Sequence, residues 1–389
     1  MAKPEQAGRM CGAMAFSPIN KFFSLFSHDI GIDLGTANTL VFVKDKGIVI
    51  REPSVVAKHK KTKRVIAIGT DAKKMLGKTP ASILTIRPLK GGVIADFDAT
   101  EAMISHYIKQ VHEMGATLPR LLARPKVVIG IPSAVTEVER RAVWEAALSA
   151  GAREAYLIEE PMAAAIGEGI SIFQSTGSMV VDIGGGTTEI AVISLGGIVV
   201  GRSIKLAGDD MDQSILHYIR LKNGLIIGEK TAEDIKVRIG SVYQKKSKVE
   251  MPKTKTSEAT GKGTEGNPHL EKMMIIRGRD IETGLPRSLK ITEAEIREAL
   301  APIITQIVQT VADVLEETPP ELLPDILEQG ILLTGGGAKL AGLDLLLAEK
   351  IHMPVVVSND PLTSVVRGTG KVLEDDALLE RVKVIGGLR

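Results

Sequence analysis

The sequence predicts an α/β fold built from two related halves. Strand-like apolar segments alternate with helical patterns along most of the 389 residues, which is typical of α/β proteins. One motif, an apolar strand that ends in Asp, a Gly-containing turn and a second apolar strand, occurs at residues 30–43 and again at 180–193. A repeated opening hairpin of this kind indicates two halves of similar structure.

The first half begins with strands and continues with helices. Gly- and Lys-containing turns separate its early apolar segments, and a continuous apolar run later in the half is typical of a fully buried strand. Helical periodicity appears on both sides of that run. We expect strands at 30–33, 39–43, 47–50, 54–57 and 126–132, and helices at about 100–115 and 136–150.

The overall composition is that of a globular protein. Hydrophobic residues make up 44% and charged residues 25%, and the net charge of +2 gives no sign of nucleic-acid binding. Cys11 is the single cysteine, which excludes an internal disulfide and, with no recognisable secretion signal, favours a reducing cytoplasm. No apolar run is expected to be long enough to span a bilayer.

Each of the two hairpin turns combines an acidic residue with small residues. Asp33 precedes Gly35, and Asp182 precedes Gly184–Gly186. Small residues let backbone N–H groups approach an anion closely, whereas an ionised Asp would repel a bare phosphate unless a divalent cation lay between them. Two such hairpins facing each other would hold one Mg-nucleoside triphosphate. The alternative for each is an ordinary tight turn. Neither a P-loop nor a Rossmann fingerprint is present.

Two further segments add to the predicted site. Residues 330–350 are typical of a strand, the glycines Gly335–Gly337 and a helix, so that a ligand could lie against backbone at a helix N-terminus. A plain strand-to-helix turn is the alternative. Residues 158–165 are typical of a strand followed by a Pro-initiated, Ala-rich helix that can pack closely on another. Glu160 at its start either points into the cleft or only complements the helix dipole.

Two segments differ from this pattern. Residues 244–269 contain six Lys and three Glu with Gly, Pro, Ser and Thr, so we expect a flexible polar insertion. Residues 1–27 are expected to form an extension, mostly disordered at first. The extension ends in an apolar, aromatic stretch with Phe22, Phe23 and Phe26, which suits a short amphipathic segment at a membrane interface. The alternative is that these rings pack on the domain.

Taken in order, these motifs resemble the actin superfamily, which includes actins, heat-shock chaperone ATPases and sugar kinases. The segments DLGTANTLV, GIVIREPSVVA, LIEEPMAAAIG, VVDIGGGTTEIAVI and LLTGGGAKL are closer still to the MreB family of filament-forming bacterial actins. The resemblance covers nearly all of residues 28–375. It implies an actin-like fold of two domains, each with a large α/β subdomain and a smaller inserted one, with nucleotide in the cleft between them. The domains would be 28–168 plus 365–389, with a small subdomain at about 52–90, and 169–364, with one at about 208–290.

The resemblance also implies roles for individual residues. Asp33 and Asp182 would hold Mg²⁺, and Glu160 would orient or activate the attacking water with Thr187 beside it. For Glu233 and Lys236, which are three residues apart on a helix, the alternative is a solvated pair. The residues expected to contact ATP are Thr36, Ala37, Asn38, Gly184, Gly185, Gly186, Glu233, Asp234, Ile235, Lys236, Gly335, Gly336, Gly337 and Ala338.

As a function, the resemblance implies a slow ATP hydrolase that polymerises into membrane-associated filaments and maintains rod shape by organising cell-wall synthesis. Its partners would be further copies of itself, the inner face of the cytoplasmic membrane, and membrane proteins of the cell-wall elongation machinery. Leu118, Leu121 and Leu122 would form a second membrane patch. The alternatives are a chaperone-type ATPase, which would need a substrate-binding domain after the nucleotide domain, and a small-molecule kinase, which would need an Asp base beside an acceptor pocket.

Overall fold

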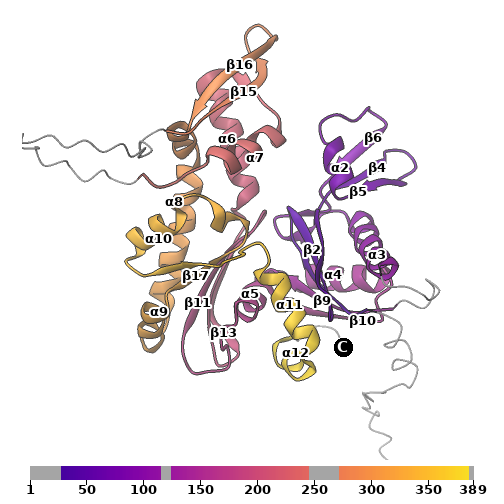
Figure 1. Cartoon of the computed structure of the whole chain (residues 1–389), viewed down its shortest axis with the longest axis vertical. Coiled ribbons are helices and arrows are strands. Elements are labelled where there is room, and N and C mark those ends of the chain that lie inside the picture. Colours follow the sequence, from indigo (N-terminus) through magenta and orange to yellow (C-terminus); the bar gives the residue numbers. More distant parts are fainter. Residues whose placement is uncertain (1–27, 115–123, 245–270, 385–389) are drawn as a thin grey trace, which may run out of the picture.

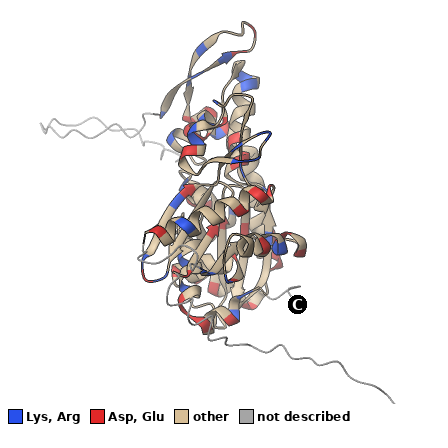
Figure 2. Cartoon of the chain, turned by 90° about the vertical axis from the view of Figure 1, so that its right-hand side faces the viewer, with Lys and Arg blue, Asp and Glu red and all other residues tan. Residues whose placement is uncertain are grey.

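The computed structural model describes residues 28–114, 124–244 and 271–384. The predicted membrane segments at 19–27 and 118–122, and residues 245–269 of the polar insertion, lie outside these ranges. Two five-stranded sheets form the centre of the molecule, with α5 (Glu160–Glu168) and α11 (Ser364–Glu374) between them (Figure 1). Along the ribbon in Figure 2, basic and acidic residues are interspersed, which agrees with the nearly balanced charge.

The first sheet has the strand order β10-β9-β1-β2-β3. β1 pairs antiparallel with β2 and parallel with β9, so a hairpin and two crossover strands share one sheet. The strands predicted at 30–33, 39–43, 47–50 and 126–132 are confirmed. The members of the sheet are β1 (Ile30–Leu34), β2 (Asn38–Val43), β3 (Gly47–Pro53), β9 (Lys126–Ile131) and β10 (Glu154–Glu159).

The second sheet repeats this topology. Its order is β13-β12-β11-β17-β18, with β11 antiparallel to β12 and parallel to β17. Reading both sheets from the hairpin outward gives the same sequence of pairings, which confirms the internal repeat. The strands are β11 (Ser178–Ile183), β12 (Thr188–Ser194), β13 (Gly197–Ile204), β17 (Ile331–Thr334) and β18 (Val355–Val357).

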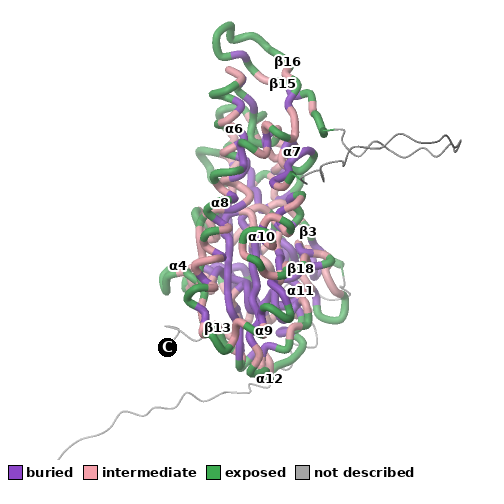
Figure 3. The backbone as a smooth tube through the Cα atoms, turned by 90° about the vertical axis from the view of Figure 1, so that its left-hand side faces the viewer, coloured by how far each residue is buried: buried purple, intermediate pink, exposed green. Residues whose placement is uncertain are grey.

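A smaller three-stranded sheet accompanies each large one, at the upper end of Figure 1. The strand predicted at 54–57 lies in the first of them and is shifted two residues later. Figure 3 shows that burial is concentrated along the large sheets, whereas the hairpin of β15 and β16 is largely exposed. The first small unit has β4 (Val56–His59), β5 (Val65–Ile68), β6 (Ile83–Ile86) and α2 (Thr70–Met75). The second has β14 (Leu225–Ile226), β15 (Met273–Asp280), β16 (Pro286–Thr292), α6 (Gly208–Asn223) and α7 (Glu229–Ile239).

Helix ends follow their capping residues. α3 (Phe97–Glu113) begins three residues before the predicted position because Asp96 caps it, accepting a hydrogen bond from Ala99 N at 2.9 Å. α4 (Glu137–Ser149) begins where predicted, behind a capping box formed by Thr136 and Glu139. The remaining helices on the sheet faces are α8 (Glu293–Glu317), α9 (Leu323–Gln329) and α10 (Leu343–Ile351).

α8 is the longest described helix on the faces of the second sheet. By length and mean hydropathy alone this 25-residue helix could cross a membrane, and it is the one such helix among the described residues. Its buried side chains recur every three or four positions and join the core of the second half, which is the pattern of an amphipathic helix packed on a sheet. They are Ile296, Ala299, Leu300, Ile304, Ile307, Val311 and Val314.

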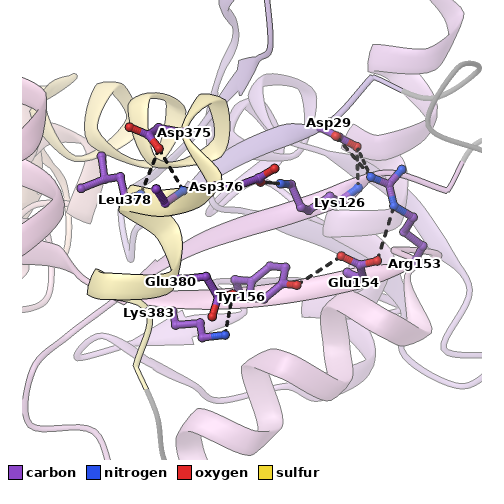
Figure 4. Close-up of polar contacts among 11 residues, drawn as sticks. Asp29, Lys126, Arg153, Glu154, Tyr156, Asp375, Asp376, Leu378, Glu380 and Lys383 are labelled. Carbon is purple, nitrogen blue, oxygen red and sulfur yellow. Dashed lines mark hydrogen bonds and ion pairs between the residues drawn. The ribbon is translucent and has the colours of Figure 1, made fainter. Parts of the chain in front are cut away.

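The last helix, α12 (Asp376–Val382), returns to the first sheet (Figure 4). Lys126 Nζ on β9 lies 2.6 Å from Asp376 Oδ1, and the backbone N–H of Lys126 donates to Asp29 at 2.8 Å. Arg153 lies 3.2 Å from Asp29 on the same edge. Asp375 caps α12 through the backbone N–H groups of residues 377 and 378. These contacts fasten the C-terminal helix to the base of the first half.

Candidate functional site

A cavity of about 570 Å³ lies between the two halves, and we call it the central cavity. Its volume falls within the roughly 300–1,000 Å³ of small-molecule sites. The turns of both hairpins, the start of α5, one face of α7 and the glycine run after β17 all contribute to its wall. The predicted site residues that line it are Asp33, Thr36, Ala37, Asn38, Glu160, Asp182, Gly184, Gly185, Gly186, Thr187, Glu233, Lys236, Gly335, Gly336 and Gly337.

The tips of the two hairpins touch each other across the cavity floor. A Cβ added to Gly185 would lie 2.6 Å from Ala37 Cβ, and one added to Gly186 would lie 2.5 Å from Thr36 Oγ1. Both distances are too short for real side chains, so only glycine fits at these two positions. Thr36 Oγ1 also accepts a hydrogen bond from Gly92 N at 3.1 Å. Both tips also line the central cavity, so their small residues let backbone N–H groups approach a ligand there.

The glycine run after β17 packs against the second hairpin. Gly335 has φ +81°, and a Cβ there would lie 2.6 Å from Asp182 Oδ1. The predicted helix does not start at the run: a 3-10 turn (Gly336–Lys339) begins within it, and α10 begins only at Leu343. Gly342, directly before α10, has φ +80°, a left-handed conformation that interrupts a helical path. The run therefore forms no α-helix N-terminus.

Three buried carboxyl groups face the cavity. Burial, with the charge of Asp182, raises the pKa of Asp33 to about 8. Burial raises the pKa of Asp182 to about 6, although a 2.9 Å hydrogen bond from Thr334 Oγ1 opposes the shift. The pKa of Glu160 is also well above its ordinary value, because of burial and then the charges of Glu189, Asp33 and Asp182. Among the described residues, the charges that shift these three pKa values are all negative.

Asp33 and Asp182 suit a magnesium ion that is bound together with phosphate. Each ends a strand at the same cavity floor, and burial disfavours their charged forms unless a cation is close. Within the described ranges, no three acidic, His or Cys side chains are close enough to hold an ion by themselves. Mg²⁺ commonly takes one or two carboxylates and completes its shell with water and phosphate oxygens. The donor set and the glycine cradle beside it fit that pattern.

Three residues expected to contact nucleotide do not line the cavity. Ile235 and Ala338 are buried in the hydrophobic core of the second half, and Asp234 lies beside the cavity wall without forming part of it. The reason is helical geometry: on α7, positions 233 and 236 share the face toward the cavity, and position 235 points to the core. Ala338 lies in the 3-10 turn with its side chain inward.

The predicted pair on α7 is not a solvated i,i+3 pair. Lys236 Nζ lies 2.9 Å from Asp212 Oδ1 and donates to the Gly208 carbonyl at 2.6 Å. Glu233 instead pairs with Lys73 of α2 at 2.8 Å, so this contact joins the two halves. Each residue therefore has its own partner at the cavity wall.

Several lining residues were missed by sequence reasoning. Arg87, after β6, pairs with Asp209 at the start of α6 at 2.6 Å and so forms a second link between the halves. Asp212 lies one turn further along α6, and burial raises its pKa to about 6 while Lys236 opposes the shift. The segment LAGDDMD at 206–212 could have predicted a contribution to the site, because small and acidic residues again follow a strand, as they do in the two hairpins. No local pattern marked Lys73 or Arg87.

Comparison with known proteins places this site in a family context. The family model described as MreB/Mbl protein matches residues 27–265 and 253–381. The cell shape-determining protein MreB of Escherichia coli (strain K12) is 50% identical over 360 residues, which cover 92% of this chain and 96% of that protein. The cell shape-determining protein Mbl of Bacillus subtilis (strain 168) is 48% identical over 360 residues. The match covers 92% of this chain and the whole of that protein.

Solved structures show the same architecture. MreB5 of Spiroplasma citri, crystallised with ADP and with AMPPNP, superimposes with a TM-score of 0.79 at 38% identity, covering 91% of this chain and 98% of that one. The MamK double helical filament gives a TM-score of 0.69 at 21% identity, covering 89% of this chain and 98% of that one, which supports the fold alone. The predicted actin-like α/β fold is therefore confirmed.

Proposed function

The chain belongs to the MreB/Mbl family of actin-like, cell-shape-determining proteins, and from that premise we propose that it is an ATPase whose nucleotide state controls filament assembly. One observation carries the proposal: two Asp-ended hairpins from related halves meet at the floor of one cavity. The relative with ADP or AMPPNP bound supports nucleotide as the ligand. On this reading the domains divide as 28–168 plus 365–389, and 169–364.

The residues at the cavity divide the work of hydrolysis. Asp33 and Asp182 would hold Mg²⁺, which when bound neutralises charge on phosphate oxygens. Gly184–Gly186 line the cavity, and without side chains of their own they let phosphate approach their backbone. Glu160, which lines the cavity from the start of α5, accepts a hydrogen bond from the attacking water and takes its proton. Thr187 lies on the opposite half and completes the wall around that water.

The test of the proposal is single-turnover phosphate release by the purified full-length chain, with ATP affinity measured beside it. Wild type should release phosphate slowly and should pellet at high speed with ATP. Glu160→Ala should keep ATP affinity but slow release by roughly 10²–10⁴-fold. Polymer of the variant should accumulate, because its ATP state persists. An equal loss of ATP affinity and hydrolysis rate would instead support a helix-dipole role for Glu160. If the same amount of protein pellets with and without nucleotide, the filament is not controlled by ATP.

We also propose that the filament attaches to the cytoplasmic membrane through its N-terminal extension. The proposal rests on the sequence, since Phe22, Phe23 and Phe26 lie outside the described residues. Three rings gain roughly 1.5–3 kcal/mol each on burial, which ordering the chain partly offsets. A monomer should therefore bind weakly, and a polymer that sums many anchors should bind firmly.

Liposome co-sedimentation tests this attachment with and without ATP. The variant with all three Phe residues changed to Ser should still polymerise with ATP but should no longer co-sediment with the liposomes. If it sediments with them as well as wild type does, the leucine patch at 118–122 becomes the next candidate anchor. Membrane proteins of the cell-wall elongation machinery, as partners of the attached filament, belong to the same proposal.

A further inference from the structure

Glu189 on β12 is a buried carboxyl group that the hydrolysis scheme above does not use. Its side chain is completely inaccessible to solvent. Oε1 accepts a hydrogen bond from Ser203 Oγ on β13 at 2.5 Å, and Oε2 accepts one from Ser133 N at 3.1 Å. Ser203 belongs to the second half and Ser133 to the first. Glu189 therefore bridges the two halves without lining the central cavity.

The internal repeat shows that the fold itself does not require this carboxyl group. Glu189 pairs with Asp182 across the second hairpin, and the residue that pairs with Asp33 in the first hairpin is Leu40. Leu40 is buried as well. A buried carboxyl group costs stability unless its hydrogen bonds offset the loss of water. Glu at one of two equivalent positions thus points to a task that only the second half performs.

The segment that Glu189 holds, Gly130–Ser133, contacts the reactive residues directly. A Cβ on Gly130 would lie 3.6 Å from Glu160 Cγ, so Glu160 rests against the first residue of the segment. Pro132 and Thr187 flank Gly92 together, with Cγ atoms 2.7 and 2.8 Å from a Cβ built there. One end of the segment thus touches Glu160, its middle lies beside Thr187, and its last residue is bound by Glu189.

We propose that Glu189 is a positioning residue for ATP hydrolysis: by binding Ser133 it fixes the segment Gly130–Ser133 of the first half against the second half, and so sets Glu160 and Thr187 relative to each other. Glu189 does not itself line the central cavity. Its effect should appear in the rate of the chemical step and not in nucleotide affinity, because a small misplacement of a catalytic group is enough to slow a reaction.

The experiment compares Glu189→Leu, Glu189→Gln and Ser203→Ala with wild type. Glu189→Leu inserts the residue of the first half and removes the bridge, and it should slow single-turnover phosphate release by about 10- to 100-fold with ATP affinity nearly unchanged. Glu189→Gln can still accept from Ser133 N and donate to Ser203 Oγ, so it should retain most of the rate. Ser203→Ala leaves the cross-half bond in place and should have a smaller effect than the Leu variant.

A second readout is independent of hydrolysis. Trp144, the single tryptophan of the chain, lies on α4, which begins four residues after Ser133. It packs partly buried on the core of the first half. With saturating AMPPNP, Trp144 emission in Glu189→Leu should differ from wild type, because the segment before α4 is no longer held. Emission in Glu189→Gln should match wild type.

The inference rests on the proposed ATPase activity, and the two can fail separately. If wild type does not hydrolyse ATP, or if Glu160→Ala hydrolyses it normally, the proposed function fails. If both behave as expected and Glu189→Leu keeps the wild-type rate, only the positioning role is overturned. It is overturned as well if Glu189→Leu loses affinity and rate together, if Glu189→Gln is as slow as Glu189→Leu, or if Trp144 emission is identical in all three proteins.

Discussion

At the scale of single residues, the charge of Asp182 is predicted to make nucleotide binding depend on Mg²⁺. Asp182→Asn keeps an oxygen for the 2.9 Å hydrogen bond from Thr334 but removes the charge that would attract the ion. ATP affinity measured with Mg²⁺ should fall by about 10- to 100-fold, while affinity in excess EDTA should hardly change.

The matched control is Thr334→Val, which removes the hydrogen bond and leaves the carboxylate in place. It should keep a clear difference between ATP affinity with Mg²⁺ and with EDTA. If Asp182→Asn also keeps that difference, Asp182 does not hold the ion, and the assignment of the cavity floor as a metal site would have to be abandoned.

Single residues of the candidate site could be predicted where the residues that act together are neighbours in the sequence. Asp33 and Asp182 lie within a few residues of their small turn residues, so each hairpin could be recognised from one short segment. Lys73 was missed, because only the packing of α2 near α7 brings it to the cavity. Ile235 was expected to contact nucleotide from the resemblance, but its side chain lies in the core, because a helix turns about 100° per residue and directs neighbouring residues to different sides.

At the scale of elements, the crossing of α5 and α11 is predicted to depend on small residues. A Cβ on Gly368 of α11 would overlap the Ala163 carbonyl oxygen of α5, and one on Gly167 would overlap the Ser364 carbonyl oxygen. Gly368→Ala must push the helices apart and should lower the free energy of unfolding by about 1–3 kcal/mol in a denaturant titration.

Gly197→Ala is the control for that substitution. No heavy atom lies within 4 Å of a Cβ at Gly197, and its φ is not positive. Its free energy of unfolding should stay within about 0.5 kcal/mol of wild type. If Gly368→Ala is equally harmless, then the two helices are not packed by backbone contact at this point, and the close crossing between the halves is wrong.

Elements were predictable where periodicity or a cap defines them. The Ala-rich sequence of α5 indicated a close helix packing, and Gly167 and Gly368 show how that closeness is reached. The helix after Gly335–Gly337 starts later than expected, because a 3-10 turn begins within the glycine run and Gly342, with φ +80°, lies directly before α10. The sequence of α8 contains no long continuous apolar run, because its apolar residues form a stripe along one face of the helix.

At the scale of the whole molecule, the repeated hairpin motif predicted two related halves, and the two five-stranded sheets confirm that repeat. What holds the halves together could not be predicted in the same way. The links at the cavity mouth, Lys73–Glu233 and Arg87–Asp209, each join residues more than 100 positions apart. Since both pairs line the cavity, they close its rim when formed and must separate if the small units move apart.

The rim pair Lys73–Glu233 is therefore predicted to slow nucleotide release. Lys73→Glu places two carboxylates together across the cavity and should accelerate release of a fluorescent ADP analogue by about two- to tenfold, a modest effect because the pair is partly exposed. The double variant Lys73→Glu/Glu233→Lys restores opposite charges and should return release toward the wild-type rate. Lys74→Glu is the matched control, because Lys74 pairs with Asp71 on its own helix and does not reach the second half.

Stopped-flow measurements at low and high salt give the rate of nucleotide release for wild type and the three variants. If the Lys73–Glu233 pair slows nucleotide release, the increase in release rate caused by Lys73→Glu should be smaller at high salt and should be absent in the double variant. If the double variant releases nucleotide as fast as Lys73→Glu, the contact between Lys73 and Glu233 does not restrain nucleotide release.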